Sequence, residues 1–149
     1  MPKTSQFTHR RRVEFAETDM AGIVHFAQFY RYMEEAEHAF LRSVGLTVME
    51  HKADGTVVGW PRVSAKCGFK SPAFFGDTLS IEVSVQRIGV KSLTLDYTFT
   101  RDDGGDEPVL VAEGTMKTVA CTFTPDRVMT SVPVPDAFLE RITEVESPE

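Results

Sequence analysis

The sequence has few of the features that mark membrane or secreted proteins. It contains two cysteines and one tryptophan in 149 residues. No run approaches the roughly 20 apolar residues of a membrane-spanning helix, and the first residues, MPKTSQFTHRRR, contain no apolar segment of the signal-peptide type. We therefore expect a soluble, cytoplasmic protein in which Cys67 and Cys121 are reduced core thiols rather than a disulfide.

Positive charge is also scarce. The formal net charge is -6 and the pI is about 5.2. The only basic run, at residues 10–12, falls where a first strand is expected. This balance disfavours general nucleic-acid binding, and an anionic partner would have to be bound by a local group of side chains.

Several common catalytic motifs are missing. There is no G-x-S-x-G elbow, no glycine-rich phosphate loop and no paired His/Cys spacing. Glu35 and His38 form an E-x-x-H pattern, but a di-metal site needs a second such motif, which the sequence lacks. We interpret this pair as part of a solvated helix face, and we expect no metal and no cofactor.

Length and hydrophobic periodicity predict one α+β domain over residues 1–149. Apolar residues recur at three- and four-residue steps from Phe26 to Val44, which predicts an amphipathic helix of about 19 residues, or about 28 Å. Gly45 can end it in a left-handed conformation. A short terminal helix is expected at residues 136–145.

The remaining segments alternate apolar and polar residues, which is typical of strands with one solvated face. Consecutive strands separated by turn residues should form an antiparallel meander, with the long helix covering one face of a five-stranded sheet. The open sheet edges favour a homodimer or a larger oligomer. The expected strands are residues 7–15, 57–69, 79–86, 93–100 and 109–123.

One carboxylate, Asp19 in AETDMAGIVHF, stands about six residues before the long helix. A helix amino-terminus presents free N–H groups and partial positive charge, so it could bind the oxyanion of a tetrahedral intermediate while Asp19 attacks a carbonyl carbon or activates water. Thioesters suit this pair because a thiolate leaves without strong acid catalysis. The alternative is a helix cap, although a cap would sit at the first turn.

The segment VEFAETDMAGIVHFAQFYRYMEEA resembles the first strand, aspartate loop and central helix of hotdog-fold acyl-CoA thioesterases, in particular the 4-hydroxybenzoyl-CoA thioesterase type. The similarity continues through VVGWPRVSAKCGFKSPAFFGDTLSIEVSV, the Lys91-Ser92 pair and TPDRVMTSVPVP. The resemblance implies a long central helix wrapped by a curved antiparallel sheet. It also implies dimers joined edge to edge, often paired into tetramers, with active sites at the dimer interface.

The resemblance also assigns roles to individual residues. Asp19 corresponds to the catalytic carboxylate, as nucleophile or general base, and the Phe26 backbone N–H to the oxyanion donor. The coenzyme A contacts correspond to Arg87, Lys91 and Ser92, with Lys91 as the phosphate partner. Gly22, Ile23 and Val24 belong to the loop expected to border the substrate.

Some residues depart from the family pattern. Many relatives have Tyr-His where this chain has His25-Phe26, so His25 is expected to line the pocket or to orient Asp19 or a water. Gly89 and Val90 replace basic residues, which predicts weaker binding of coenzyme A phosphates or a different carrier.

The acyl end of the expected site also differs. Glu34 corresponds to a helix carboxylate near the acyl group, and Trp60 replaces a small hydroxyl residue and should reshape the pocket. Glu37 falls within the apolar arc of the helix, where a carboxylate needs a partner. Either it pairs with an arginine such as Arg62 or reaches the dimer interface, or it lines the acyl pocket and selects a polar tail.

The sequence therefore predicts hydrolysis of an acyl-CoA thioester. Alternatives are a non-catalytic acyl-CoA-binding or regulatory hotdog domain, and a thioesterase that acts on acyl-carrier protein. A hydratase of the same fold ranks last, because it would need a closely spaced Asp and His. The native acyl group is left open.

Overall fold

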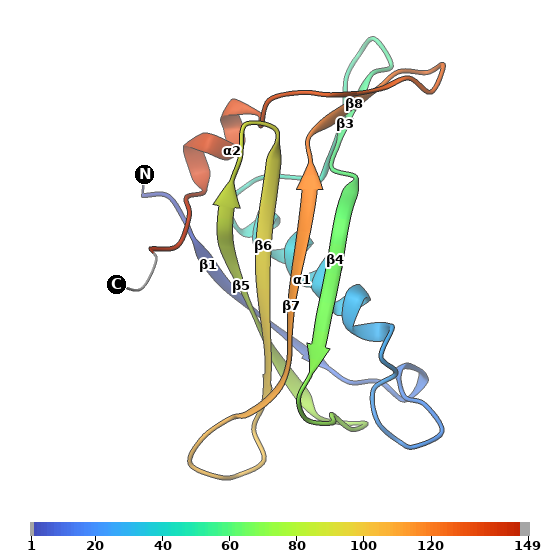
Figure 1. Cartoon of the computed structure of the whole chain (residues 1–149), viewed down its shortest axis with the longest axis vertical. Helices are drawn as coiled ribbons and strands as arrows, with labels where there is room; N and C mark the ends of the chain where they lie inside the picture. The colour runs from blue at the N-terminus through green and yellow to red at the C-terminus, as the bar shows by residue number, and fades with distance from the viewer. Residues whose placement is uncertain (1, 147–149) are drawn as a thin grey trace.

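The computed structural model describes residues 2–146 as two helices and two antiparallel sheets (Figure 1). The expected α+β class is confirmed. In chain order the elements are β1 (Gln6–Arg12), the single 3-10 turn η1 (Phe15–Glu17), α1 (Gln28–Ser43), β2 (Met49–His51), β3 (Val57–Gly59), β4 (Arg62–Phe69), β5 (Thr78–Ile88), β6 (Ser92–Arg101), β7 (Val109–Val119), β8 (Cys121–Phe123), β9 (Met129–Ser131) and α2 (Asp136–Arg141).

The main sheet has the strand order β1-β5-β6-β7-β4, and every neighbouring pair is antiparallel. The predicted meander is confirmed for β5, β6 and β7, which follow one another in the chain and in the sheet. β4 forms one edge, and almost all of its residues are exposed on both faces, including Val63 and Phe69. An edge with exposed apolar side chains is a surface on which another strand can pair.

A second sheet, β2-β3-β8-β9, was not predicted. The expected strand at residues 57–69 is divided between β3 and β4 at Trp60 and Pro61, and the one at residues 109–123 is divided between β7 and β8 at Ala120. Pro61 has no N–H for the ladder, so its position is a natural break in pairing. The four three-residue strands form an arm beyond the start of β4 and the end of β7 (Figure 1).

Helix α1 crosses one face of the main sheet (Figure 1) and contacts β1, β5 and β4. It has 16 residues, fewer than the predicted 19, because Phe26 and Ala27 form a turn before it. Gly45 follows it with φ +78°, the left-handed conformation expected there. Its buried residues that pack against the sheet include Phe29, Met33 and Phe40. Gly114 lets the layers approach, because a Cβ there would lie 2.6 Å from Met33 Cε.

Other predictions near the chain ends need correction. The first strand ends at Arg12, before η1, and α2 ends at Arg141 rather than continuing to residue 145.

Cys121 is buried and Cys67 is only partly buried on β4, and both are free. No helix among residues 2–146 is long and apolar enough to cross a membrane.

Glu37 makes the salt bridge that was one of its two sequence interpretations. Its side chain is 4% exposed, and Arg62 Nη2 of β4 lies 2.7 Å from Glu37 Oε1. Burial raises the pKa of Glu37, and the positive charge of Arg62 only partly offsets that effect. Arg62 thereby joins the edge strand to α1 through a charge that is costly to bury.

Replacing Glu37 by Gln should change how stability depends on pH. The raised pKa means that the folded chain binds this proton more tightly than the unfolded chain does. The stability that Glu37 contributes is therefore present below the ordinary carboxyl pKa and is lost as pH rises through the raised value. We expect the unfolding free energy of the wild type to fall relative to that of Glu37→Gln as the pH rises above about 4.

Urea denaturation at a series of pH values measures this difference. Glu82→Gln, on the exposed face of β5, is the matched control and should stay parallel to the wild type. Parallel profiles for Glu37→Gln and the wild type would contradict the prediction.

Candidate functional site

The aspartate loop is a tight turn closed by backbone hydrogen bonds. Thr18 and Val24 form an antiparallel bridge, and the Asp19 N–H donates to the Ile23 carbonyl at 2.9 Å. The Gly22 N–H donates to the Asp19 carbonyl, and Gly22 has φ +81°, a conformation that glycine adopts at no steric cost. The sequence therefore folds locally so that Asp19 is held at a defined position.

The Asp19 side chain does not cap a helix. Its Oδ1 accepts the N–H of Ala21 at 2.9 Å, within the loop itself. The residue before α1 is Ala27, which makes no side-chain cap. Within the part of the chain that the structure describes, Asp19 Oδ2 accepts no hydrogen bond. The capping interpretation is wrong, and one carboxylate oxygen stays available to a reactant.

Beyond the loop, a backbone donor at the start of α1 has no partner within residues 2–146. Gln28 donates its N–H to the His25 carbonyl, and Phe29 donates to Phe26. The Phe26 N–H itself has no acceptor among the described residues. It lies at the positive end of the helix dipole, where an anion is stabilised.

His25 hydrogen-bonds the backbone and not Asp19. Its Nδ1 accepts the Ala27 N–H at 3.2 Å, and its ring stacks on Phe26 with 4.7 Å between centroids. Because Nδ1 is an acceptor, this hydrogen bond favours the tautomer with the proton on Nε2. His25 is exposed beside the loop.

Sequence reasoning missed Glu17, two residues before Asp19. Its side chain is 11% exposed and accepts hydrogen bonds from Arg11 of β1 and from Tyr32 and Gln28 of α1. Burial alone would raise the pKa of Glu17, but the bonds from the Glu14 N–H, Tyr32 and Arg11 outweigh it, and the pKa is lowered. No sequence pattern signals this network, because its members come from three different elements.

The residues expected at the acyl end lie farther away. Glu34 is exposed on α1, about 12 Å of helix rise beyond Phe26. Trp60 is 8% exposed and packs against Phe138 of α2, with 4.8 Å between ring centroids. It borders a cleft of about 180 Å³ near Leu46, past the carboxyl end of α1. Within one chain, Trp60 is therefore a core residue that does not meet the aspartate loop.

The residues expected to contact coenzyme A lie at the opposite end of the sheet. Ile23 bridges to Phe74, just before β5 begins, whereas Arg87 is near the end of β5 and Lys91 is in the turn that follows. The 11 residues of β5 span about 35 Å. Lys91 Nζ lies 3.4 Å from Ser131 Oγ on an exposed surface. One chain does not bring these residues to Asp19.

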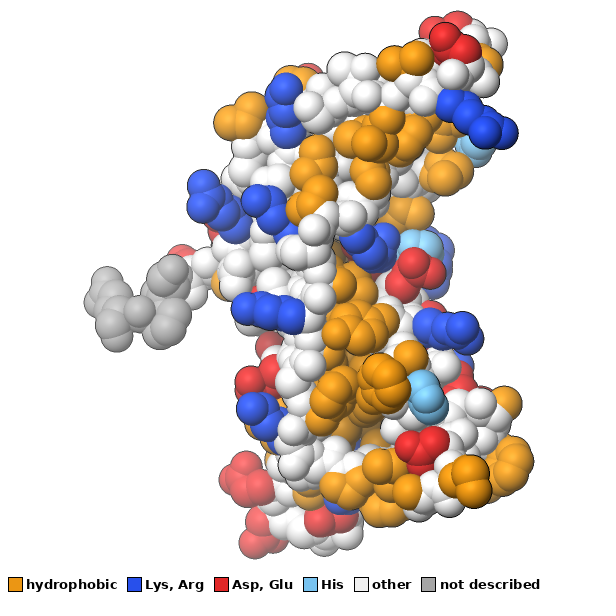
Figure 2. Space-filling view, turned by 45° about the vertical axis from the view of Figure 1, so that its right-hand side comes forward, with side chains coloured by type: hydrophobic (Ala, Val, Ile, Leu, Met, Phe, Trp, Pro, Cys, Tyr) orange, Lys and Arg blue, Asp and Glu red, His pale blue; other side chains and the backbone are white. Residues whose placement is uncertain are grey.

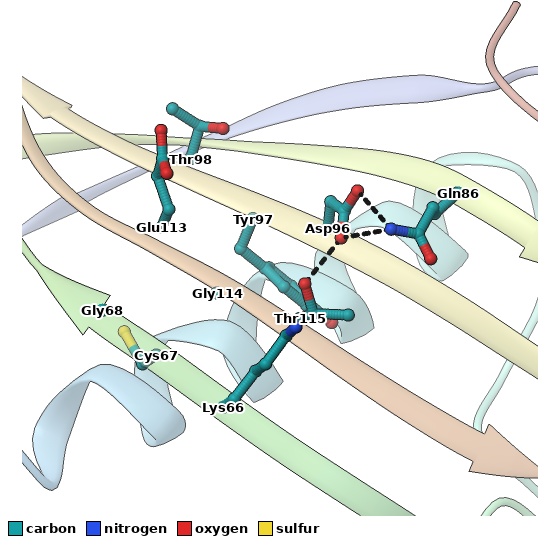
Figure 3. A pocket seen from close by; sticks show the side chains of 10 residues that line it. All are labelled: Lys66, Cys67, Gly68, Gln86, Asp96, Tyr97, Thr98, Glu113, Gly114 and Thr115. Atoms are coloured by element: carbon teal, nitrogen blue, oxygen red, sulfur yellow. Dashed lines mark hydrogen bonds between the residues drawn. The ribbon is translucent and has the colours of Figure 1, made fainter. Parts of the chain in front are cut away.

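A depression of about 670 Å³ lies on the face of the main sheet away from α1 (Figure 3). Its polar side chains bond one another: Asp96 accepts from Thr115 at 2.7 Å and from Gln86 at 3.0 Å. None of its lining residues is a predicted site residue. We interpret it as the solvated outer face of the sheet. No group of residues able to hold a metal ion occurs in residues 2–146.

Large apolar side chains surround the aspartate loop. Figure 2, in which the β4 side comes forward, shows hydrophobic side chains along this face from the arm to the loop. A contiguous exposed apolar surface usually marks an interface or a ligand site. The exposed members near the loop are Phe15, Met20, Phe26, Phe69, Phe74 and Phe75.

Comparisons with known proteins identify the family of this chain. The family model of the thioesterase-like superfamily matches residues 13–142. A 1,4-dihydroxy-2-naphthoyl-CoA hydrolase of Thermosynechococcus vestitus is 30% identical over 128 residues, which cover 86% of this chain and 82% of that protein.

Solved structures show the same fold. A 1,4-dihydroxy-2-naphthoyl-CoA thioesterase from Synechocystis has a TM-score of 0.79 and 27% identity, and the match covers 96% of this chain and 99% of that one. A gentisyl-coenzyme A thioesterase has a TM-score of 0.74 and 31% identity, with 90% and 98% covered. The resemblance drawn from the sequence is confirmed, and the chain belongs to the thioesterase-like superfamily.

Proposed function

We propose that this protein hydrolyses an acyl-CoA thioester, acting as a single hotdog domain with Asp19 as its catalytic carboxylate. One observation carries the proposal: Asp19 lies in a loop that leads directly to the Phe26 N–H at the start of α1, and among the described residues neither Asp19 Oδ2 nor this N–H has a hydrogen-bond partner. The family membership and the CoA-thioester hydrolases among its relatives support the same reaction.

The Phe26 N–H would bind the thioester carbonyl oxygen and stabilise the oxyanion as it develops. As a nucleophile, Asp19 attacks the carbonyl carbon, the C–S bond breaks, and the thiolate leaves a mixed anhydride that water then hydrolyses. As a general base, Asp19 instead takes a proton from water, which attacks the same carbon. Both routes give the free acid and the coenzyme A thiol, and the geometry is compatible with either.

The proposed site needs two copies of the chain. In one molecule Asp19 and Lys91 lie near opposite ends of β5, whose 11 residues span about 35 Å. Antiparallel pairing of two β4 edges would bring the loop end of one copy to the Lys91 end of the other. The exposed Val63 and Phe69 on β4 support this interface. A homodimer, or a tetramer of two such dimers, would then form the complete site.

In that arrangement Arg87, Lys91 and Ser92 contact coenzyme A from the partner copy. Gly22, Ile23 and Val24 border the acyl carbonyl, and Glu34 borders the acyl chain along α1. The alternatives are an acyl-carrier-protein thioesterase and a non-catalytic acyl-CoA-binding domain. The free oxygen of Asp19 favours catalysis over binding alone.

Replacing Asp19 by Asn should abolish turnover and keep the fold. The amide is nearly isosteric and can still accept the Ala21 N–H, but it neither attacks a carbonyl nor takes a proton. We expect kcat to fall by at least about 100-fold, measured by thiol release across aromatic, short-chain and long-chain acyl-CoAs.

Circular dichroism and thermal unfolding of the same sample are the control for folding. Thiol release at the wild-type rate by Asp19→Asn would show that the proposed mechanism is wrong. Saturable acyl-CoA binding without thiol release by the wild type would favour the binding domain.

Replacing Lys91 by Gln should weaken binding of coenzyme A and leave the chemical step intact. Loss of a charge-assisted hydrogen bond to a phosphate should raise KM about tenfold, with kcat within about twofold. Arg10→Gln, which removes one exposed positive charge from β1 at the sheet edge opposite β4, is the control and should change neither value. Equal KM values for Lys91→Gln and Arg10→Gln would remove Lys91 from the site.

A further inference from the structure

Glu17 joins the aspartate loop to both layers of the fold. Its carboxylate accepts the Tyr32 hydroxyl at 2.9 Å, the Gln28 amide at 3.2 Å and Arg11 Nη1 at 3.0 Å. It also accepts the backbone N–H of Glu14 at 2.8 Å. Hydrogen bonds from β1, from the residue before η1 and from the first turns of α1 therefore converge on one nearly buried side chain.

The backbone of the same residue closes the loop. The Glu17 carbonyl accepts the N–H of His25 at 2.9 Å. Asp19 is two residues after Glu17, at one end of this closing bond. Phe26 directly follows His25, at the other end. The two groups of the proposed reaction are thus both attached to the segment that Glu17 holds, and Gln28 and Tyr32 fix that segment against α1.

We propose that Glu17 is a positioning residue for catalysis: it sets the separation between the Asp19 carboxylate and the Phe26 N–H without touching the substrate. This inference rests on the proposed function. A displacement of about 1 Å between reacting groups can lower a rate by about 100-fold, so an anchor this close to both groups should affect kcat. KM should change little, because the carrier is bound elsewhere.

The negative charge of Glu17 is part of this role. Arg11, Tyr32 and Gln28 all donate to it, and each needs an acceptor. Glutamine would offer one acceptor oxygen and two N–H donors, so some of these bonds would be lost. Arg11 would still have Glu35 of α1, whose Oε2 lies 3.1 Å from Arg11 Nε. The Arg11 side chain therefore keeps an ionic partner in Glu17→Gln.

Glu35 provides the matched control. It pairs with the same arginine, lies on α1, and has no bond to the loop in the described structure. Glu17→Gln and Glu35→Gln each remove one carboxylate from Arg11, but only the first removes an anchor of the loop. A difference in kcat between them would separate positioning from general stabilisation.

The experiment measures kcat and KM for thiol release with one acyl-CoA substrate, on folded protein quantified by circular dichroism. We expect Glu17→Gln to lower kcat by about 10- to 100-fold with KM within about twofold, and Glu35→Gln to change both by less than about twofold. Tyr32→Phe, which removes one donor to Glu17 and no charge, should lower kcat by a few fold, and it serves as the test if Glu17→Gln does not fold.

A double variant tests whether Glu17 acts through Asp19. If it does, Glu17→Gln combined with Asp19→Asn should retain the same residual rate as Asp19→Asn alone, because there is no longer a carboxylate to position. A further loss equal to that of the single Glu17→Gln change would overturn the inference.

The outcomes also distinguish this inference from the proposed function. Full activity of Asp19→Asn would overturn the function and the inference with it. An inactive Asp19→Asn together with a wild-type kcat for Glu17→Gln and Tyr32→Phe would overturn only the positioning role. Equal losses of kcat in Glu17→Gln and Glu35→Gln would also overturn the positioning role, because they would show that the hydrogen bonds around Glu17 only stabilise the fold.

Discussion

The ion pair between Arg11 and Glu17 is the interaction on which the arrangement of the site depends. It connects β1 to the segment that enters the aspartate loop. Tyr32 and Gln28 of α1 donate hydrogen bonds to the same carboxylate. A charge this poorly solvated is stable only because it is fully hydrogen-bonded, and the lowered pKa of Glu17 reflects that. Layer packing and loop geometry are coupled at this point.

A second buried carboxylate follows a different balance. Glu37 has one close cationic partner, Arg62, and burial still raises the pKa of its carboxyl. Glu17 has several donors, and its pKa is lowered. The pKa shifts of these two carboxyls therefore differ in sign, because Glu37 is more deeply buried and accepts fewer hydrogen bonds than Glu17. The Glu37–Arg62 pair attaches the edge strand to α1, and the Glu17–Arg11 pair attaches the aspartate loop to β1.

The unpaired edge at β4 links the fold to the proposed function. β4 is the last strand of the sheet, is exposed on both faces and carries Val63 and Phe69. It forms an apolar border that one chain leaves uncovered. The same chain keeps Asp19 and Lys91 at opposite ends of β5. A second copy paired on β4 would cover this border and bring its Lys91 end to the aspartate loop of the first. For this reason we place the complete site between two copies.

Local patterns in the sequence determined the amphipathic helix that ends before Gly45, the meander of β5, β6 and β7, and the aspartate loop. The reason is that helix periodicity, strand alternation and turn chemistry are properties of neighbouring residues. Only the tertiary structure decided that residues 57–69 and 109–123 divide into two sheets, that Trp60 packs on α2, and that Glu17 holds the loop. These features depend on contacts between residues far apart in the chain, and no local pattern records which side chains will meet.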